Sequence, residues 1–148
     1  MGKVISVCIS TVKGQSKVPV PEITVVAGSG IKGDVHAGNW HRQISLLATE
    51  SVEPMREKYP DIPVGAFAEN ILTEGIELKS LPVGTMLQAG SAVLAVTQIG
   101  KECHADCEIR RKVGDCVMPR EGIFTIVLKS GTIRSGDAIE IISCAEKD

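Results

Sequence analysis

Two cysteines and a histidine stand close together in the stretch GKECHADCEIRRK, residues 100–112. Cys103 and Cys107 are four positions apart, and His104 lies between them. A thiolate is both a nucleophile and a ligand for soft metals, and nearby cations lower the pKa of a thiol. Lys101 and the basic residues after Cys107 supply such cations, although acidic neighbours partly offset them. The stretch therefore predicts a reactive thiol, for which Cys103 and Cys107 are both candidates.

The same stretch allows a second interpretation, a metal clip. Four soft ligands fall within 14 residues, namely Cys103, His104, Cys107 and Cys116. Zinc accepts cysteine and histidine in tetrahedral sites, but the C-x3-C spacing differs from the C-x-x-C of zinc ribbons. A third interpretation, a buried cysteine that acts as a small apolar residue, fits Cys8 and Cys144, which lie in β-prone runs. The sequence leaves the reactive thiol and the zinc clip open.

A glycine-rich stretch, GSGIKGDVHAGNWHRQ at residues 28–43, carries several polar side chains. Gly33 precedes Asp34 and His36, and Arg42 follows them. Glycine-rich backbone can bind an anion through its amides, and arginine can contact phosphate with two donors. The stretch matches neither a P-loop nor a dinucleotide fingerprint, since the required lysine, hydroxyl and helix are misplaced. We expect an exposed loop that either binds an anion or is a surface turn with solvated charges.

Glu69 and Asn70 interrupt an apolar run in VGAFAENILTEG, residues 64–75. Adjacent residues of a strand point to opposite faces, so one of the two should point inward and need hydrogen-bond partners. These partners are either other buried groups of the protein or a ligand.

Eight β-prone runs must position these residues. Each is short, rich in Val, Ile and Thr, and bounded by turn residues; the runs are 3–9, 22–27, 42–48, 69–73, 85–89, 92–99, 123–129 and 138–143. Their close spacing predicts a mostly β fold, a barrel or a sandwich.

Two helices and two hairpins complete the expected fold. Thr49 or Ser51 should cap a helix that Pro60 ends, with Pro54 in its first turn if Ser51 is the cap. A second short helix is expected over residues 105–113. Gly90 and Gly136 occupy two similar strand–turn–strand patterns, and both can adopt the positive φ that tight hairpins need.

Bulk properties exclude several classes of protein. The 148 residues suit one domain, spanning 1–148, and the net charge of −2 gives no basic footprint for nucleic acid. The longest apolar run is too short to span a membrane, and the N-terminal stretch lacks the pattern of a signal peptide. Five cysteines, an odd number, do not indicate a disulfide framework. We therefore expect a cytoplasmic protein.

Taken together, these stretches resemble the MOSC family, the domain named after the C-terminal part of molybdenum cofactor sulfurases. The matching segments run in the family's order from about Gly30 to Ile142: GIKGDVHAG, RQISLLA, GAFAENILTEGIEL, LPVGTMLQAG, VTQIGKECHADC and MPREGIFTIVLKSGTIRSGD. The resemblance implies a closed or partly open β-barrel with a few short helices. It also implies a short stand-alone type, without the barrel or desulfurase domains of longer relatives.

The resemblance further implies an association with molybdenum cofactor (molybdopterin), a pterin dithiolene that bears a phosphate. The family's cysteine, which carries sulfur or ligates molybdenum, falls on Cys103, with Cys107 as a competitor. The cofactor-binding residues that we expect are Gly33, Asp34, His36, Arg42, Glu69, Asn70 and Lys101.

The leading functional hypothesis is a cofactor-binding protein that acts in sulfur transfer or cofactor handling. One alternative is a molybdenum-dependent reductase of N-hydroxylated substrates, which needs an external electron donor. The other is a non-enzymatic, zinc-clipped binding module. The partners expected beside the cofactor are proteins of cofactor biosynthesis or molybdoenzymes.

Overall fold

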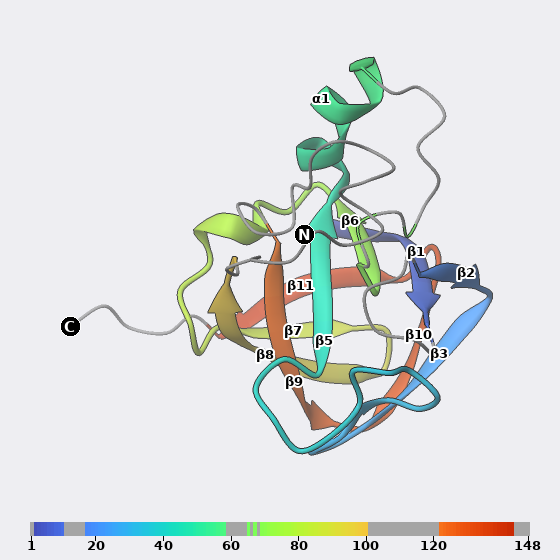
Figure 1. Cartoon of the computed structure of the whole chain (residues 1–148). Helices are drawn as coiled ribbons and strands as arrows, with labels where there is room; N and C mark the ends of the chain where they lie inside the picture. Colours follow the sequence, from blue (N-terminus) through green and yellow to red (C-terminus); the bar gives the residue numbers. More distant parts are fainter. Residues whose placement is uncertain are drawn as a thin grey trace.

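The computed structural model describes residues 2–10, 17–58, 65, 67, 69–100 and 122–143 of the chain. Most of these residues lie in strands, with one α-helix and one 3-10 helix among them (Figure 1). The elements are β1 Gly2–Ile9, β2 Val18–Val20, β3 Glu22–Val26, β4 Gly30–Ile31, β5 Ile44–Ala48, α1 Thr49–Lys58, β6 Ile71–Glu74, η1 Leu78–Ser80, β7 Met86–Ala89, β8 Ala92–Ile99, β9 Ile123–Lys129, β10 Gly131–Arg134 and β11 Ala138–Ser143.

A closed barrel of seven strands forms the body of the protein. The strand order is β11-β7-β8-β9-β5-β6-β1, and β1 pairs with β11 to close the ring. Neighbouring strands are antiparallel except β5 and β6, which run parallel and are separated in the chain by α1. A parallel pair requires such a crossover, whereas antiparallel neighbours can be joined by a tight turn. The expected β-barrel with few helices is thereby confirmed.

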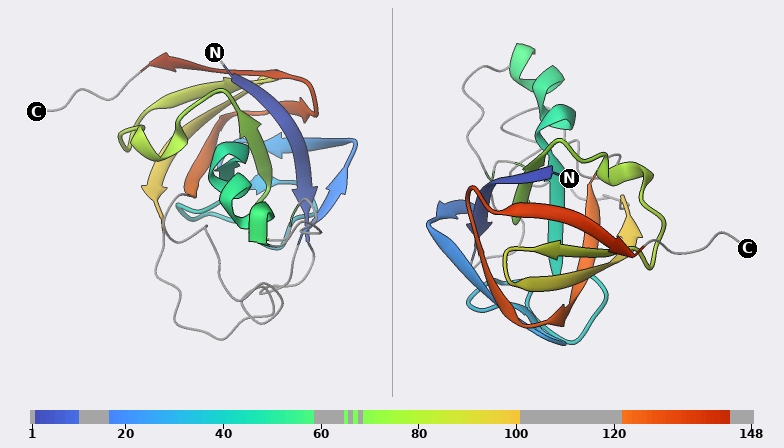
Figure 2. Two further views of the ribbon diagram at one scale, coloured as in Figure 1. Left: turned by 90° about the horizontal axis from the view of Figure 1, so that it is seen from above. Right: turned by 180° about the vertical axis from the view of Figure 1, so that it is seen from behind.

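Several further elements surround the barrel. Strand β2 pairs with β1 outside the ring, and β3 forms a small antiparallel sheet with β10 and β4. Helix α1 stands at one end of the barrel, as the views from the side and from above show (Figures 1 and 2). Val52 of α1 is buried, while Glu53, Pro54 and Glu57 are exposed. The helices in the described part of the chain are too short and too polar to cross a lipid bilayer.

The core is almost entirely aliphatic, as the scarcity of aromatic residues requires. All five residues of β5 are buried, because both of its faces are covered. In β8 the buried residues alternate with less buried ones, which is the period of a strand with one inward face. Burying each Leu or Ile of this core stabilises the fold by roughly 1.5–3 kcal/mol relative to leaving it exposed.

All eight predicted β-prone runs are strands in the structure. The helix was placed correctly, but it begins at Thr49, so Pro54 lies inside it rather than in the first turn that a cap at Ser51 would give. It ends at Lys58, two residues before Pro60. The second helix expected over 105–113 lies outside the described residues.

One of the two expected hairpins was wrong. Gly90, with φ +55°, joins β7 to β8 in a true hairpin. Gly136, with φ +95°, joins β10 to β11, but β10 pairs with β3 and β11 pairs with β7 and β1. The Gly136 N–H donates to the carbonyl oxygen of Val4 in β1. This turn therefore leads the chain from the small sheet back to the barrel.

Candidate functional site

The polar residues of the glycine-rich stretch lie between β4 and β5. Gly33 has a φ of +89°, a conformation that favours glycine, and is exposed. Asp34, the next residue, is only 6% exposed, so the alternative of a surface turn with solvated charges is wrong at this position. Its carboxylate oxygen Oδ1 accepts the backbone N–H of Ser10 at 3.0 Å, and Oδ2 accepts the backbone N–H of His36 at 3.1 Å. Asp34 thus ties the loop to the end of β1.

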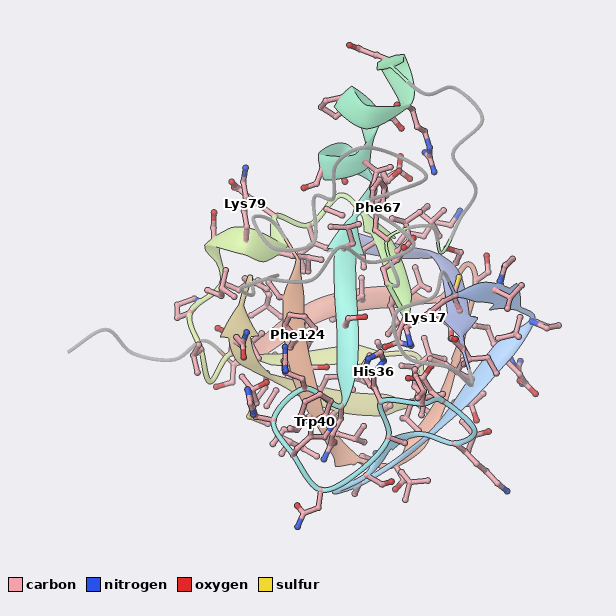
Figure 3. The ribbon with its side chains drawn as sticks, in the orientation of Figure 1. Lys17, His36, Trp40, Phe67, Lys79 and Phe124 are labelled. Atoms are coloured by element: carbon pink, nitrogen blue, oxygen red, sulfur yellow. The ribbon has the colours of Figure 1, made fainter. Side chains whose placement is uncertain are left out.

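Lys17 completes this cluster. Its side chain is 0% exposed, and its Nζ lies 2.8 Å from Oδ1 of Asp34 and 2.9 Å from Nδ1 of His36. Figure 3 shows Lys17 and His36 beside each other. One ammonium group therefore joins a buried carboxylate to a partly exposed imidazole.

The two charged groups of the cluster have shifted pKa values. Burial would raise the pKa of Asp34, but hydrogen bonds from His36, Lys17 and Ser10 and the charge of Lys17 outweigh it, so this pKa is well below its usual range. Burial lowers the pKa of Lys17, and the hydrogen bond and charge of Asp34 only partly oppose this effect. Because the two charges are opposite and paired, each offsets part of the free-energy cost of burying the other.

Aromatic and cationic groups continue from His36 along the loop. The rings of His36 and Trp40 stack with centroids 6.2 Å apart, and the Trp40 indole N–H donates to the carbonyl oxygen of His36. The guanidinium of Arg42 lies 4.8 Å from the centre of the Trp40 ring and 5.6 Å from that of Phe124 in β9. We call the set Lys17, His36, Trp40, Arg42 and Phe124 the loop row; four of its members are labelled in Figure 3.

Arg42 contains an unusual donor. Its Nε is buried and has no hydrogen-bond partner among the residues that the structure describes. Buried donors nearly always have a partner, so such a group calls for an explanation. An anionic ligand at the loop row would supply one.

The loop between β4 and β5 also contacts the end of β8. Nε2 of His41 lies 2.8 Å from the amide oxygen of Gln98 at the end of β8, and the Gln98 amide donates to the carbonyl oxygen of Gly100. The Gly100 N–H donates to the carbonyl oxygen of Gly122, just before β9. Gly100 and Gly122 therefore lie side by side, and Gln98 links Gly100 to His41 of the loop.

The two candidate thiols, Cys103 and Cys107, lie outside the described residues, as do Lys101, His104 and Cys116. Their predicted roles stay predictions. Within the described part of the chain, no group of three or more metal-ligating side chains is close enough to hold a metal ion.

Both Glu69 and Asn70 are buried, not one of the two, because they precede β6 and do not follow its alternation. The oxygens of Glu69 accept the backbone N–H groups of Gly65 and Phe67 at 2.9 and 3.1 Å. Burial raises the pKa of Glu69 despite these bonds.

Asn70 lies at the junction of three strands. Its Oδ1 accepts the backbone N–H of Ser45 in β5, and its Nδ2 donates to the carbonyl oxygen of Cys8 in β1. These hydrogen bonds satisfy the buried side chain of Asn70 without a ligand. Its contact with the cofactor stays a prediction.

Cys8 behaves as the sequence predicted for an inert thiol. It is 0% exposed, and burial, followed by the charge of Glu69, raises its pKa to about 12. A thiol in this state is a poor nucleophile.

Sequence reasoning missed three members of the loop row. Lys17 precedes β2 and has no local pattern that distinguishes it from a surface lysine. Phe124 was recognised only as part of a strand. Trp40 offered a usable signal, since the chain's single tryptophan lies two residues from Arg42 in a polar loop.

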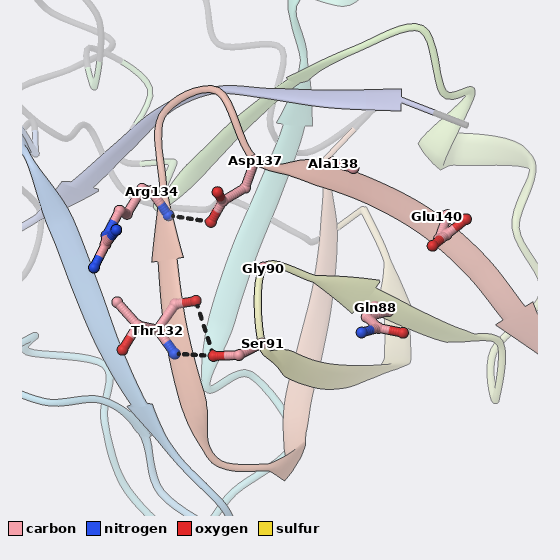
Figure 4. Close-up of a pocket in the computed structure, with 8 residues that line it drawn as sticks. All are labelled: Gln88, Gly90, Ser91, Thr132, Arg134, Asp137, Ala138 and Glu140. Atoms are coloured by element: carbon pink, nitrogen blue, oxygen red, sulfur yellow. Dashed lines mark hydrogen bonds between the residues drawn. The ribbon is translucent and has the colours of Figure 1, made fainter.

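A hollow of about 430 Å³ lies at the side formed by β7, β10 and β11 (Figure 4). Several polar groups around it bond one another: the Ser91 hydroxyl contacts both backbone groups of Thr132, and Asp137 accepts the N–H of Arg134. Asp137 lies in the turn before β11, where aspartate is a common turn residue. Because these groups are already paired, this hollow is a weaker candidate than the loop row.

Comparisons with known proteins concern the family and the fold of the chain. The model of the MOSC domain family matches residues 32–140. No curated protein matches the sequence.

Several solved structures share the fold. The YuaD protein from Bacillus subtilis is 22% identical with a TM-score of 0.77, over 95% of this chain and 96% of that one. YiiM from Geobacillus stearothermophilus is 20% identical with a TM-score of 0.72, over 97% of this chain and 76% of its own. YiiM from Escherichia coli is 16% identical with a TM-score of 0.70, over 98% and 72%. At these identities the likeness concerns the fold alone.

Proposed function

Because the chain belongs to the MOSC domain family, whose members are related to molybdenum cofactor, we propose that it binds this cofactor and handles sulfur through Cys103. The observation that carries the proposal is the guanidinium of Arg42, held against two aromatic rings with a buried Nε that has no partner among the described residues. A phosphate oxygen is the acceptor that such a group lacks.

The residues of the loop row fit the phosphate-bearing end of the cofactor. Stacking on Trp40 and Phe124 restricts the Arg42 side chain before any ligand arrives, so less entropy is lost on binding. At Gly33 an added Cβ would meet no atom within 4 Å, so the backbone there is open to close approach. Trp40, at 36% exposed, is an aromatic side chain beside Arg42.

Cys103, the proposed reactive thiol, is close in sequence to residues that contact the glycine-rich loop. Cys103 follows Gly100 by three residues, a length of chain that spans at most about 11 Å when fully extended. The carbonyl oxygen of Gly100 accepts a hydrogen bond from the Gln98 side chain, which also contacts His41 of the loop. When bound, the cofactor supplies molybdenum held by dithiolene sulfurs, a soft centre that suits a thiolate.

The sulfur chemistry proposed for Cys103 is an exchange without net oxidation. Its thiolate attacks the outer sulfur of a donor persulfide, the sulfur–sulfur bond of the donor breaks, and the donor leaves as a thiolate. Cys103 then carries the persulfide. Cys8 is unsuited to this role, because it is fully buried and its pKa is raised to about 12.

Single cysteine variants test the proposal. The protein is purified from a molybdenum-replete host as wild type, Cys103→Ala and Cys107→Ala, with Cys8→Ala as the matched control for loss of a thiol. Molybdenum, zinc and oxidised pterin are quantified, and intact mass reports a sulfur adduct.

We expect molybdenum with pterin, or a one-sulfur adduct, in the wild type and in Cys107→Ala, and neither in Cys103→Ala. Retention of both in Cys103→Ala, with their loss in Cys107→Ala, would transfer the role to Cys107. Stoichiometric zinc without pterin or adduct would overturn the proposal in favour of the zinc clip.

A further inference from the structure

We propose that Lys17 is a positioning residue that holds the imidazole of His36 with its proton on Nε2, so that His36 offers a neutral hydrogen-bond donor to an anion at the loop row. The geometry of Lys17, Asp34 and His36 carries this inference. The identity of the anion as a phosphate group rests on the proposed function, whereas the position of the proton does not.

The first step is the charge of Lys17. Its Nζ lies 2.8 Å from a carboxylate oxygen of Asp34, and both side chains are 0% exposed. A neutral amine at this position would leave the buried carboxylate without a compensating charge, which is strongly unfavourable. The hydrogen bond and the charge of Lys17 are among the causes that lower the pKa of Asp34, in agreement with an ion pair.

The second step is the direction of the hydrogen bond to His36. An ammonium group has donors and no acceptor, so at 2.9 Å the Nδ1 atom of His36 accepts a hydrogen bond from Lys17. The same Nδ1 lies 3.7 Å from Oδ2 of Asp34, which is beyond hydrogen-bond distance. A neutral imidazole that accepts at Nδ1 carries its own proton on Nε2. Lys17 therefore selects one of the two tautomers.

The third step is the orientation of the ring. The backbone N–H of His36 donates to Oδ2 of Asp34, its carbonyl oxygen accepts from Trp40, and its ring stacks on the indole. With Nδ1 directed at Lys17, Nε2 lies on the far side of the ring and has no partner among the described residues. The side chain is 31% exposed, so a ligand can reach this donor.

The ligand class follows from what lies beside this donor. Trp40 contacts both the His36 ring and the guanidinium of Arg42. The indole thus lies beside one neutral donor and one permanent cation, a combination that suits a phosphate monoester or a similar oxyanion. Lys17 itself, fully buried and already paired, does not contact that ligand but acts through His36.

The test is the tautomer of His36 in ¹⁵N-labelled protein, read from two-bond ¹H–¹⁵N correlations of the ring. His36→Gln identifies the signal by its loss. The wild type is compared with Lys17→Met and with Lys32→Met, which removes an exposed lysine of the same loop. We expect a single Nε2–H tautomer in the wild type and in Lys32→Met, and a mixture of tautomers in Lys17→Met.

An Nδ1–H tautomer in the wild type, or an unchanged tautomer in folded Lys17→Met, would overturn the assignment. If Lys17→Met does not fold, the wild-type spectrum alone decides it.

Inorganic phosphate is the probe for the ligand. Phosphate should shift the Nε2 resonance of His36 in the wild type, and folded Lys17→Met should bind it about 2- to 10-fold more weakly, the effect of one hydrogen bond. A correct tautomer with no shift on adding phosphate would overturn the donor role at this site. Cofactor content that depends on Cys103 is measured separately, so the two proposals can fail independently.

Discussion

Asp34 and Glu69 are two buried carboxylates, 6% and 2% exposed, and the fold stabilises them in opposite ways. Asp34 faces the ammonium of Lys17, and its pKa is lowered. Glu69 accepts the backbone N–H groups of Gly65 and Phe67, and its pKa is raised because burial outweighs those bonds. The hydrogen bonds of Asp34, together with the charge of Lys17, outweigh the effect of burial on its pKa, whereas the backbone hydrogen bonds of Glu69 do not.

The two carboxylates also have different structural roles, although both contribute to the placement of Lys17. Asp34 fixes the side chain of Lys17 and, through it, the imidazole of His36. Glu69 holds the turn at Gly65, whose carbonyl oxygen accepts the backbone N–H of Lys17. Asp34 thus fixes the charged side chain of Lys17 beside the candidate site, and Glu69 stabilises the turn that holds the backbone of Lys17.

The largest expected effect is from Lys17→Met, because it leaves Asp34 buried and without its charged partner. We expect a loss of about 3–5 kcal/mol in the free energy of unfolding at pH 7, measured by urea denaturation. Lys32→Met, at an exposed position, should change stability by less than about 0.5 kcal/mol.

The double variant Lys17→Met/Asp34→Asn sharpens this test. It removes both charges and should be more stable than Lys17→Met alone. If the double variant were less stable than the single one, the ion pair would not explain the loss.

Gly65→Ala should rank next. A Cβ there would lie 2.1 Å from the carbonyl oxygen of Lys17, and Gly65 also has a φ of +86°. Gly33→Ala is the matched control, since its φ is +89° but its Cβ would meet no atom within 4 Å. Backbone strain should cost about 1–2 kcal/mol in both variants, and the clash should add roughly 1–3 kcal/mol at Gly65 alone. Equal losses in thermal or urea unfolding would show that the turn moves freely away from Lys17.

Lowering the pH should change the contributions of the two carboxylates to folding stability in opposite directions. The pKa of Asp34 is lowered from 3.8, so its contribution is present above that pH and is lost as the pH falls below it. The pKa of Glu69 is raised from 4.5, so its contribution is present below that pH and is lost as the pH rises through the folded-state value.

Stability curves from pH 3 to 7 for Asp34→Asn and Glu69→Gln would measure this difference. The deficit of Asp34→Asn, about 1.5–3 kcal/mol at pH 7, should shrink below pH 3.8. The deficit of Glu69→Gln should shrink above pH 4.5. Parallel curves would contradict the assignment of opposite shifts.

The smallest expected effect on stability is that of Arg42→Gln. The side chain loses its contacts with Trp40 and Phe124, which are worth about 0.5–1 kcal/mol each at partly exposed sites. At the same time the variant no longer buries a guanidinium donor without a partner, which offsets part of that loss. We expect a net change below about 1.5 kcal/mol by urea denaturation, and a larger loss would show that Arg42 is mainly structural.

The strands could be predicted because each is a short apolar run between turn residues, and the fold class followed from their spacing. Their partners could not be predicted in the same way. The chain around Gly136 has the local chemistry of a hairpin, yet β10 pairs with β3, which lies more than 100 positions earlier. Local turn chemistry specifies that the chain reverses, whereas long-range packing decides which strand it joins.

The site was predictable where the residue type is informative. Asp34, His36 and Arg42 stood out as polar groups in a glycine-rich loop, and all three belong to the cluster or to the loop row. Lys17 could not be found, because its importance comes entirely from burial beside Asp34, 17 positions away. Asn70 was found as a candidate, but its bonds to Ser45 and Cys8 depend on strand neighbours that sequence alone does not give.

The most direct test of the central claim is the molybdenum and pterin content of Arg42→Gln beside Lys32→Gln, both purified from a molybdenum-replete host. The second variant removes a cation from the same loop at an exposed position and is the matched control. We predict cofactor in the wild type and in Lys32→Gln, and a reduction of about tenfold or more in folded Arg42→Gln, the value of a hydrogen bond to a charged group. Equal cofactor content in the two variants would contradict the placement of the cofactor at the loop row.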